Sequence, residues 1–196
     1  MEIKGDRIFI KPLELEDVFH MRNWGYHDNP LLEDYNFPIL TDKQIGRWYK
    51  FKVKSFSDKY YGIHTYNDIL IGYMGIKNIR RIFRESTLGI VFDPDYVNQG
   101  YGSEALELFL QYYFNKMKMK KMYLEVAQFN TRAKRVYEKI GFKSIGYYLD
   151  GYPNENLDFA NKYYLESKSS FVISDGKIYN YIYKMELNRD DFLKKF

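Results

Sequence analysis

A strand that leads through a glycine-containing loop into a helix constrains this 196-residue chain more than any other segment. The apolar run from Leu88 to Phe92 predicts a strand, the loop Val97 to Gly102 follows, and the next helix is expected to open at Ser103. Backbone N–H groups at the start of a helix have no acceptor within the helix, and the helix dipole is positive there. The sequence therefore predicts a site for an anion, such as a phosphate group, at this junction.

The periodicity of the remaining chain predicts one mixed domain. Apolar runs indicate strands at residues 8–12, 60–66, 69–76, 87–92, 122–126, 143–149 and 177–187. Capping residues and helical spacing indicate helices at residues 14–24, 41–54, 103–118 and 132–139. No repeat, low-complexity tract or linker-like stretch divides the chain. We therefore expect an α+β fold over residues 1–196, with a mixed, mostly antiparallel twisted sheet that is flanked by helices.

Composition excludes several kinds of chemistry. The chain has no cysteine, so disulfides, thiolate metal sites and a cysteine acyl-enzyme intermediate are ruled out. Its three histidines, at positions 20, 27 and 64, have no metal-ligand spacing, and we expect no metal site. The charged N-terminal segment and the lack of a run of about 18 apolar residues speak against a signal peptide and a membrane span. We expect a soluble, cytoplasmic protein that does not associate with membranes.

The net charge of +4 is unevenly distributed along the chain. Residues 114–143 carry nine Lys or Arg and two Glu, a net charge of +7, whereas residues 147–166 carry four acids and one Lys, a net charge of −3. A basic face beside the glycine loop suits a polyphosphate, and an acidic stretch suits a cationic second substrate. For any single lysine a solvated helix surface is the simpler explanation. Binding of nucleic acid through the basic segment is a weaker interpretation, and no nucleic-acid partner is expected.

The glycine loop admits two interpretations. Residues 100–105 satisfy the pattern G-x-G-x-x-A of dinucleotide-binding folds, and Glu125 ends the next strand where such folds keep a ribose-binding acid. In those folds, however, the first glycine directly follows the strand, whereas seven residues, Asp93 to Gln99, intervene here. The unit also begins only after 87 residues of other structure, which leaves too little chain for the usual parallel sheet. The context therefore disfavours a dinucleotide site.

The second interpretation explains more residues. The loop Val97-Asn98-Gln99-Gly100-Tyr101-Gly102 is followed, in order, by Asn130-x-x-Ala133-x-x-x-Tyr137-x-x-x-Gly141-Phe142. Together they resemble the acetyl-coenzyme A site of the GCN5-related N-acetyltransferase (GNAT) superfamily, nearest to its ribosomal-protein N-acetyltransferase-like group. Residues 8–13 and 71–75 also look familial, so the resemblance covers most of residues 5–148 and resumes at residues 175–187. It implies a single GNAT-like domain that transfers an acetyl group directly from acetyl-CoA, as cosubstrate, to a primary amine.

The resemblance assigns a role to each matched residue. Main-chain amides of the loop are expected to hold the diphosphate, with Ser103 adding a hydroxyl, the end of the preceding strand to bind the pantetheine arm, and Asn130 to orient it. These expected cofactor-binding residues are Val91, Phe92, Gln99, Gly100, Tyr101, Gly102, Ser103 and Asn130. Tyr137 is expected to protonate the departing thiolate. For Tyr137 alone, a buried core tyrosine is the competing explanation.

The chain also departs from the family pattern. Val97 stands where the family usually has Gln or Arg, which predicts weakened cofactor affinity. Thr87 stands where related sequences often have a glutamate, so the general base is open. Glu85 is the candidate on the same strand face, and Asp93 is a further one. The missing glutamate also supports an alternative function, a non-catalytic acyl-CoA binding or sensing module. The connection at about residues 150–172 looks longer than is usual in the family.

Acceptor recognition is expected to lie in the segments that vary most. The loop from Trp24 to Phe37 carries three acids, Asp28, Glu33 and Asp34, among aromatic residues. Carboxylates with aromatic walls suit a cationic amine, so we expect this loop and the connection at 150–172 to line an acidic acceptor cleft. The acceptor is a small molecule or a peptide: a protein N-terminus, a polyamine, an amino sugar and an aminoglycoside all stay open. Association as a homodimer stays open as well.

Overall fold

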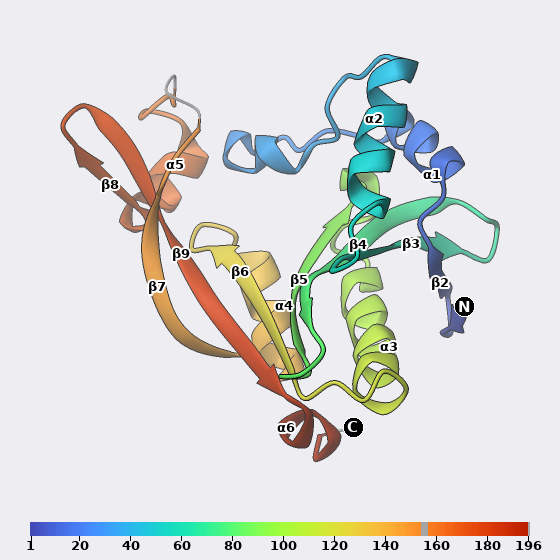
Figure 1. Ribbon diagram of the computed structural model, residues 1–196. Helices are drawn as coiled ribbons and strands as arrows, with labels where there is room; N and C mark the ends of the chain where they lie inside the picture. Colours follow the sequence, from blue (N-terminus) through green and yellow to red (C-terminus); the bar gives the residue numbers. More distant parts are fainter. Residues whose placement is uncertain (154–156, 196) are drawn as a thin grey trace.

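A computed structural model describes residues 1–153 and 157–195, in which helices flank one nine-stranded sheet (Figure 1). The strands are β1 (Ile3–Lys4), β2 (Ile8–Pro12), β3 (Lys59–Thr65), β4 (Leu70–Arg80), β5 (Glu85–Phe92), β6 (Lys121–Ala127), β7 (Lys143–Gly151), β8 (Phe171–Ser174) and β9 (Lys177–Asn188). The α-helices are α1 (Leu15–His20), α2 (Asp42–Val53), α3 (Tyr101–Asn115), α4 (Thr131–Ile140), α5 (Lys162–Glu166) and α6 (Arg189–Leu193). The expected α+β class, with a mixed and mostly antiparallel sheet, is confirmed.

The sheet contains one parallel pair, and that pair parts halfway. The strand order is β1-β2-β3-β4-β5-β6-β9-β7, with β8 paired to β9, and every neighbouring pair except β5 and β6 is antiparallel. Strands β5 and β6 pair from Glu85 and Lys121 to Leu88 and Leu124, and the pairing stops there. A parallel pair needs a crossover, which α3 supplies. Beyond Leu88 the two strands diverge, and the sheet opens at the carboxyl ends of both (Figure 1).

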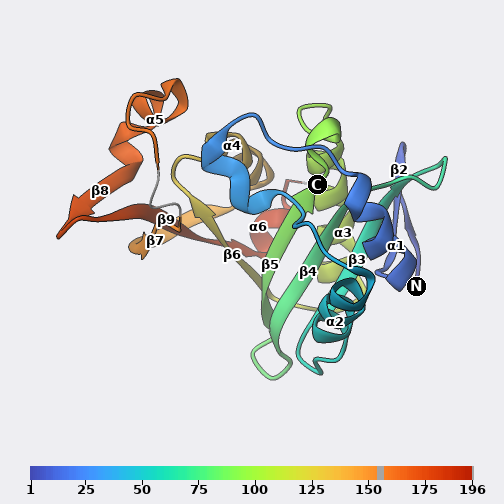
Figure 2. The ribbon, with the colours of Figure 1, turned by 90° about the horizontal axis from the view of Figure 1, so that it is seen from above.

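The main core lies between the sheet and the crossover helix. One side of α3 places Ala105, Leu106, Phe109, Leu110, Tyr113 and Phe114 against the strands, and all six are buried. Tyr113 satisfies its hydroxyl within this core: it donates to the carbonyl oxygen of Lys121 at 2.7 Å, and its oxygen lies 2.8 Å from Oγ of Ser86. Helix α4 covers the same face, so α3 and α4 approach the break between β5 and β6 from one side (Figure 2).

The opposite face carries a second core beneath α1 and α2. Buried residues of this core include Val18, Trp24, Ile45 and Tyr60. The helix expected at 14–24 is shorter: α1 ends at His20, and a 3-10 turn, η1 (Met21–Asn23), follows. Trp24 then leaves the helical path because its indole N–H donates to the carbonyl of Leu70 at 3.2 Å.

Two further segments form a separate lobe. The 3-10 segment η2 (Pro30–Tyr35) packs on the long connection after β7 through a third buried cluster, which comprises Leu31, Tyr152, Leu157, Tyr164 and Phe171. Residues 154–156 of the expected connection lie outside the described part of the chain. The remainder holds elements that the sequence pattern did not indicate, namely α5, the 3-10 turn η4 (Lys168–Ser170) and β8. Within the described residues, no helix combines the length and apolar character that crossing a membrane requires.

Candidate active site

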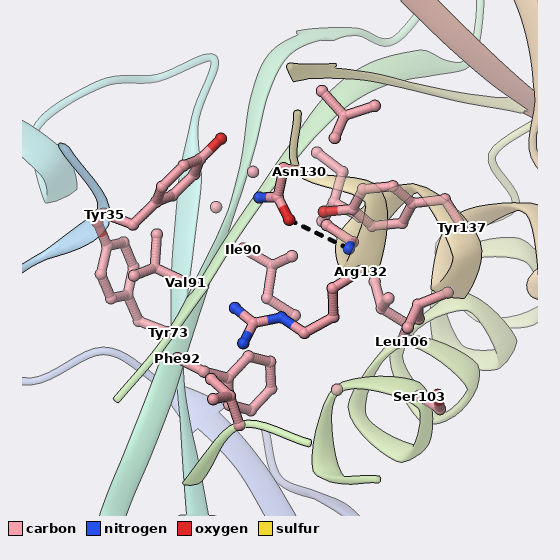
Figure 3. Close-up of a pocket in the computed structure, with 18 of the residues that line it drawn as sticks. Tyr35, Tyr73, Ile90, Val91, Phe92, Ser103, Leu106, Asn130, Arg132 and Tyr137 are labelled. Carbon is pink, nitrogen blue, oxygen red and sulfur yellow. Dashed lines mark hydrogen bonds between the residues drawn. The ribbon is translucent and has the colours of Figure 1, made fainter. Parts of the chain in front are cut away.

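A cavity of about 310 Å³ occupies the break between β5 and β6. Its size falls within the range of small-ligand sites. One end is lined by the start of α3 and by α4, and the other end by β3, β4 and the last turn of α2. Figure 3 shows Asn130, Arg132 and Tyr137 facing Tyr35, Val91 and Phe92 across this space. The residues that the sequence assigned to one site are therefore brought together, with the exceptions given below.

The α3 end of the cavity has the backbone geometry of an anion site. Gly100 is the N-cap of α3 and has φ of +85°, a conformation that side chains with a Cβ rarely adopt. This turn lets α3 begin at Tyr101, two residues earlier than expected. The N–H groups of the first turn have no acceptor within the helix and lie at the positive end of its dipole. Asn98, Gly100, Gly102 and Ser103 all line the cavity, so this end fits the diphosphate of acetyl-CoA.

The remaining two loop residues point their side chains elsewhere. The amide of Gln99 donates to the carbonyl of Asp95 at 2.8 Å. The ring of Tyr101 lies beneath the guanidinium of Arg7, 4.4 Å from its centroid. Arg7 also donates to the carbonyl of Gln99 at 3.0 Å and to Glu104 at 2.8 Å. Gln99 and Tyr101 therefore offer main-chain groups only, and Arg7, which the sequence did not single out, braces the loop from outside.

The end of β5 forms one wall of the cavity. Val91 and Phe92 still pair with Tyr73 and Gly72 of β4, but no strand pairs with them on the other side. Their side chains point to opposite faces, because Val91 packs against the α2 core and Phe92 against the α3 core. The main chain of both residues therefore presents an open edge to the cavity, as the predicted contact with an extended pantetheine arm requires.

Asn130 and Tyr137 lie on the opposite wall. Asn130 is the N-cap of α4, where its side-chain oxygen accepts a hydrogen bond from the N–H of Ala133 at 3.2 Å. Tyr137 follows almost two turns later, is only 8% exposed and packs its ring edge-on against Phe142. Its hydroxyl points towards Asn130 (Figure 3). Burial raises the pKa of Tyr137 well above its ordinary value, so the phenol carries its proton over the physiological range.

Two neighbours of Tyr137 were not identified from the sequence. Tyr35 reaches the cavity from η2 and interacts with the side chain of Asn130, and burial raises its pKa. The guanidinium of Arg132 lies near Phe92 inside the cavity (Figure 3), where burial lowers its pKa. Arg132 occupies a position that the motif leaves unspecified, so the pattern contained no signal for it. Tyr35 was noted only as one aromatic residue of a variable loop.

The two candidate bases lie outside the cavity. Glu85 shares the strand face of Thr87, as expected, but it starts β5, seven residues and about 20 Å of strand from Phe92. There its carboxylate pairs with Arg80 and accepts a hydrogen bond from the hydroxyl of Tyr123 at 3.4 Å. Asp93 is buried and accepts from the N–H groups of Gly25 and Asp95 at 3.0 and 3.1 Å. Burial raises the pKa of Asp93. Both carboxylates therefore hold structure at the ends of β5.

Glu125 is the carboxylate that the described part of the chain places at the cavity. It lies near the end of β6, is exposed, and accepts a hydrogen bond from the hydroxyl of Tyr148 at 3.2 Å. The sequence drew attention to Glu125 only within the disfavoured dinucleotide interpretation. Among the described residues, no group of three or more His, Asp or Glu side chains is arranged to hold a metal ion.

The expected acceptor loop contributes fewer residues than its composition indicated. His27 and Tyr35 line the cavity, whereas Asp28, Glu33 and Asp34 do not. Trp24 and Phe37 are buried in the α2 core, and Tyr26 is exposed. The wall on the α2 side is instead formed by Lys52, Tyr60, Tyr73 and Lys77.

Comparison with known proteins agrees with this geometry. The model of a family described as acetyltransferase (GNAT) domain matches residues 7–143. YnaD of Bacillus subtilis (strain 168), an uncharacterized N-acetyltransferase, is 26% identical over 166 residues, which make up 84% of this chain and 95% of the relative. A spermidine N(1)-acetyltransferase of Vibrio cholerae is 21% identical over 169 residues, 86% of this chain and 94% of the relative. A crystal structure of spermidine N-acetyltransferase from Vibrio cholerae in complex with CoA and spermine shares the fold, with a TM-score of 0.72 at 18% identity over 96% of this chain and 99% of that one.

The family match covers more than half of the chain, from the strand that precedes α1 to the start of β7. Both motifs that carried the resemblance lie within it, and both line the cavity. The chain therefore belongs to the acetyltransferase (GNAT) domain family and is an N-acetyltransferase that moves an acetyl group from acetyl-CoA to an amine acceptor.

Proposed function

We propose that acetyl transfer takes place in the cavity between β5 and β6, with the diphosphate of acetyl-CoA at the N-terminus of α3. The main-chain N–H groups of residues 99–103 would hold the diphosphate, and the hydroxyl of Ser103 would add a donor. The open edge of Val91 and Phe92 would bind the pantetheine arm. One observation carries this proposal: a single cavity joins the first turn of α3 to the phenol of Tyr137. Acetyl-CoA supplies the acetyl thioester.

Tyr137 would act as the general acid. Its raised pKa keeps the proton on the phenol, which is the form that a donor needs. Asn130 would orient the amide groups of the pantetheine arm, since its side-chain oxygen already accepts from Ala133 and its amide N–H groups are left to donate. Tyr35 would hold Asn130 in place through its interaction with that side chain.

Glu125 is the group that we propose as proton acceptor. An alkylamine titrates near ~10.4 and arrives mostly protonated, so one proton must leave before its nitrogen can attack. The nitrogen then forms a bond to the acetyl carbon while the bond from carbon to sulfur breaks. The sulfur takes a proton from Tyr137, and the nitrogen loses its second proton. Since the chain has no cysteine, transfer is direct, without a cysteine-bound acetyl intermediate.

The acceptor is a primary amine that approaches from the α2 side of the sheet. Aromatic side chains of Tyr60 and Tyr73 border that approach, and Glu125 offers it one carboxylate. The names of the relatives favour a polyamine as one candidate acceptor. A peptide N-terminus, as the likeness to ribosomal-protein N-acetyltransferases implies, is another. Homodimer formation is a further proposal, supported by the exposed apolar residues Ile145, Tyr147 and Leu149 of the outermost strand β7.

Calorimetry and a thiol-release assay test the proposal together. Titration of the intact protein with CoA and acetyl-CoA is expected to give saturable heat at one site per chain. Release of CoA can be followed with a thiol reagent without background from the protein, because the protein has no cysteine. If acetyl-CoA bound equally well after a bulky substitution such as Gly102→Val, the α3 end would not be the diphosphate site.

A further inference from the structure

Two lysines line the acceptor side of the cavity, and their placement bears on the chemistry of the acceptor. Lys52 lies in the last turn of α2, and Lys77 lies on β4. Lys77 alternates along β4 with Gly75 and Tyr73, and Tyr73 packs into the α2 core. Both lysines therefore belong to the α2 side of the sheet, opposite the α3 helix whose N-terminus is proposed to hold the diphosphate.

The position of Lys52 is fixed by aromatic rings. Its ammonium nitrogen lies 5.1 Å from the ring centroids of both Trp48 and Tyr60. Such contacts hold a cation over the faces of the rings while the stem of the lysine packs beneath. Tyr60 in turn lies directly over Gly75, where an added Cβ would come within 2.4 Å of its ring. Lys52 is thus held at the cavity wall by packed side chains.

Lys77 reaches over a floor made of two paired glycines. Gly75 and Gly89 lie opposite each other on β4 and β5, and the ammonium of Lys77 lies 3.5 Å from where a Cβ of Gly89 would be. Because both glycines lack a side chain, the amine of Lys77 can lie close to the sheet surface beside the cavity. Glu125 lies on β6, on the far side of the break, at the same level along the strands as Gly89. Two strand spacings, ~10 Å, separate β4 from β6 in an unbroken sheet.

Neither lysine has a carboxylate within 4.0 Å among the described residues. Burial lowers the pKa of Lys52, the charge of Lys77 lowers it further, and Asp58 partly offsets both effects. Asp58 itself accepts hydrogen bonds from Ser57 and Asn78 in the neighbouring loops. Two half-buried like charges at a cavity wall are unfavourable unless an anion neutralises them.

We propose that Lys52 and Lys77 bind a carboxylate or phosphate group of the acceptor, so that the substrate is a primary amine with an anionic group at its far end. The amine lies near Glu125 and the proposed thioester position, and the anionic group lies across the glycine floor. This inference rests on the proposed function and narrows it: the far ammonium of a linear diamine would meet two positive charges. Specificity for the anionic group follows from the electrostatic difference between the two kinds of acceptor.

Matched pairs of acceptors test the inference by thiol release. The probes are 5-aminopentanoate against 1,5-diaminopentane and 1-aminopentane, and phosphoethanolamine against ethylenediamine. For at least one pair, we expect kcat/KM of the anionic member to exceed that of its diamine by tenfold or more. The pentanoate and phosphate arms show which anionic group is preferred. A kcat/KM for every diamine that equals or exceeds its anionic counterpart would overturn the inference.

Variants of the two lysines link the preference to this surface. The double variant Lys52→Met, Lys77→Met is expected to abolish the preference by raising KM of the anionic acceptor, with kcat/KM for 1-aminopentane unchanged within about threefold. Lys77→Glu is expected to reverse it in favour of the diamine. Lys54→Met, an equal change of charge at the exposed C-cap of α2, is the control and should leave the preference intact.

The outcomes separate this inference from the function on which it rests. Thermal unfolding of each variant, expected within a few degrees of the native protein, shows that the fold persists. An unchanged preference in the folded double variant would refute the role of the lysines, even with normal turnover of 1-aminopentane. Absence of thiol release with every amine, anionic or not, would instead refute the proposed function.

Discussion

Replacing Tyr137 by phenylalanine removes one oxygen atom from the wall of the cavity and leaves the ring in place. The ring packs edge-on against Phe142 with centroids 5.9 Å apart, and this contact does not involve the hydroxyl. We therefore expect the free energy of unfolding to change by less than ~1 kcal/mol, which corresponds to a shift in Tm of at most about 4 °C for a chain of this size.

The expected kinetic effect is larger. General acids contribute about 10²- to 10⁴-fold to rate. An alkyl thiol, with a pKa near ~8.5, leaves more readily without a proton than an alcohol does, so the lower part of that range applies. We expect kcat to fall between about tenfold and a hundredfold, which corresponds to ~1.4 to 2.8 kcal/mol of transition-state stabilisation. Affinity for acetyl-CoA should be unchanged, because the proposed diphosphate site lies at the other end of the cavity.

Steady-state kinetics, calorimetry with acetyl-CoA and thermal unfolding measure these three quantities. Tyr164→Phe is the matched control, since Tyr164 is 5% exposed, nearly as buried as Tyr137, but lies in the lobe outside the cavity. It should leave kcat within twofold. Because burial raises the pKa of Tyr137, the native enzyme should show no loss of kcat from deprotonation of this phenol up to about pH 10. Near-normal turnover of Tyr137→Phe would remove this residue from the mechanism.

Three further substitutions test other parts of the site. Gly100→Ala forces a Cβ into a left-handed conformation, at a cost of ~1 to 2 kcal/mol, and should raise the Kd for CoA by tenfold or more in calorimetry; an unchanged Kd would contradict the role of this turn. Glu125→Gln should lower kcat/KM at pH 7 at least tenfold but approach native values near pH 10, where the amine is deprotonated without help; a pH-independent deficit would exclude a role as proton acceptor. Glu85→Gln should leave kcat/KM within twofold, since Glu85 pairs with Arg80 outside the cavity, and a tenfold loss would return it to the candidates.

The sequence predicted those parts of the fold that local pattern determines. The loop around Gly100 and the cap at Asn130 are specified by residues close in sequence, because a left-handed glycine and a side-chain N-cap each need only their immediate neighbours. The strands expected at 8–12 and 122–126 match β2 and β6 to within a residue at each end. Hydrophobic period alone indicated them.

The parts that failed depend on contacts between distant segments. Glu85 and Thr87 do share a strand face, but period gives no position along the strand relative to the break, and the break is set by where β6 stops pairing. Lys52, Lys77 and Glu125 come from three separate elements that meet only after the sheet is assembled. Strand β8 was missed because four residues, Phe171–Ser174, give little alternation from which to detect it.

The lobe built from η2 and the connection after β7 has a consequence for the order of folding. Its contacts join segments more than 100 residues apart in the chain, such as the hydroxyl of Tyr152 and the carbonyl of Pro30. Closing so long a loop costs entropy and is recovered only once the sheet has brought both ends near each other. The lobe should therefore form last and open first, which would let the acceptor entrance breathe in native-state hydrogen exchange while the grip on the nucleotide end stays shut.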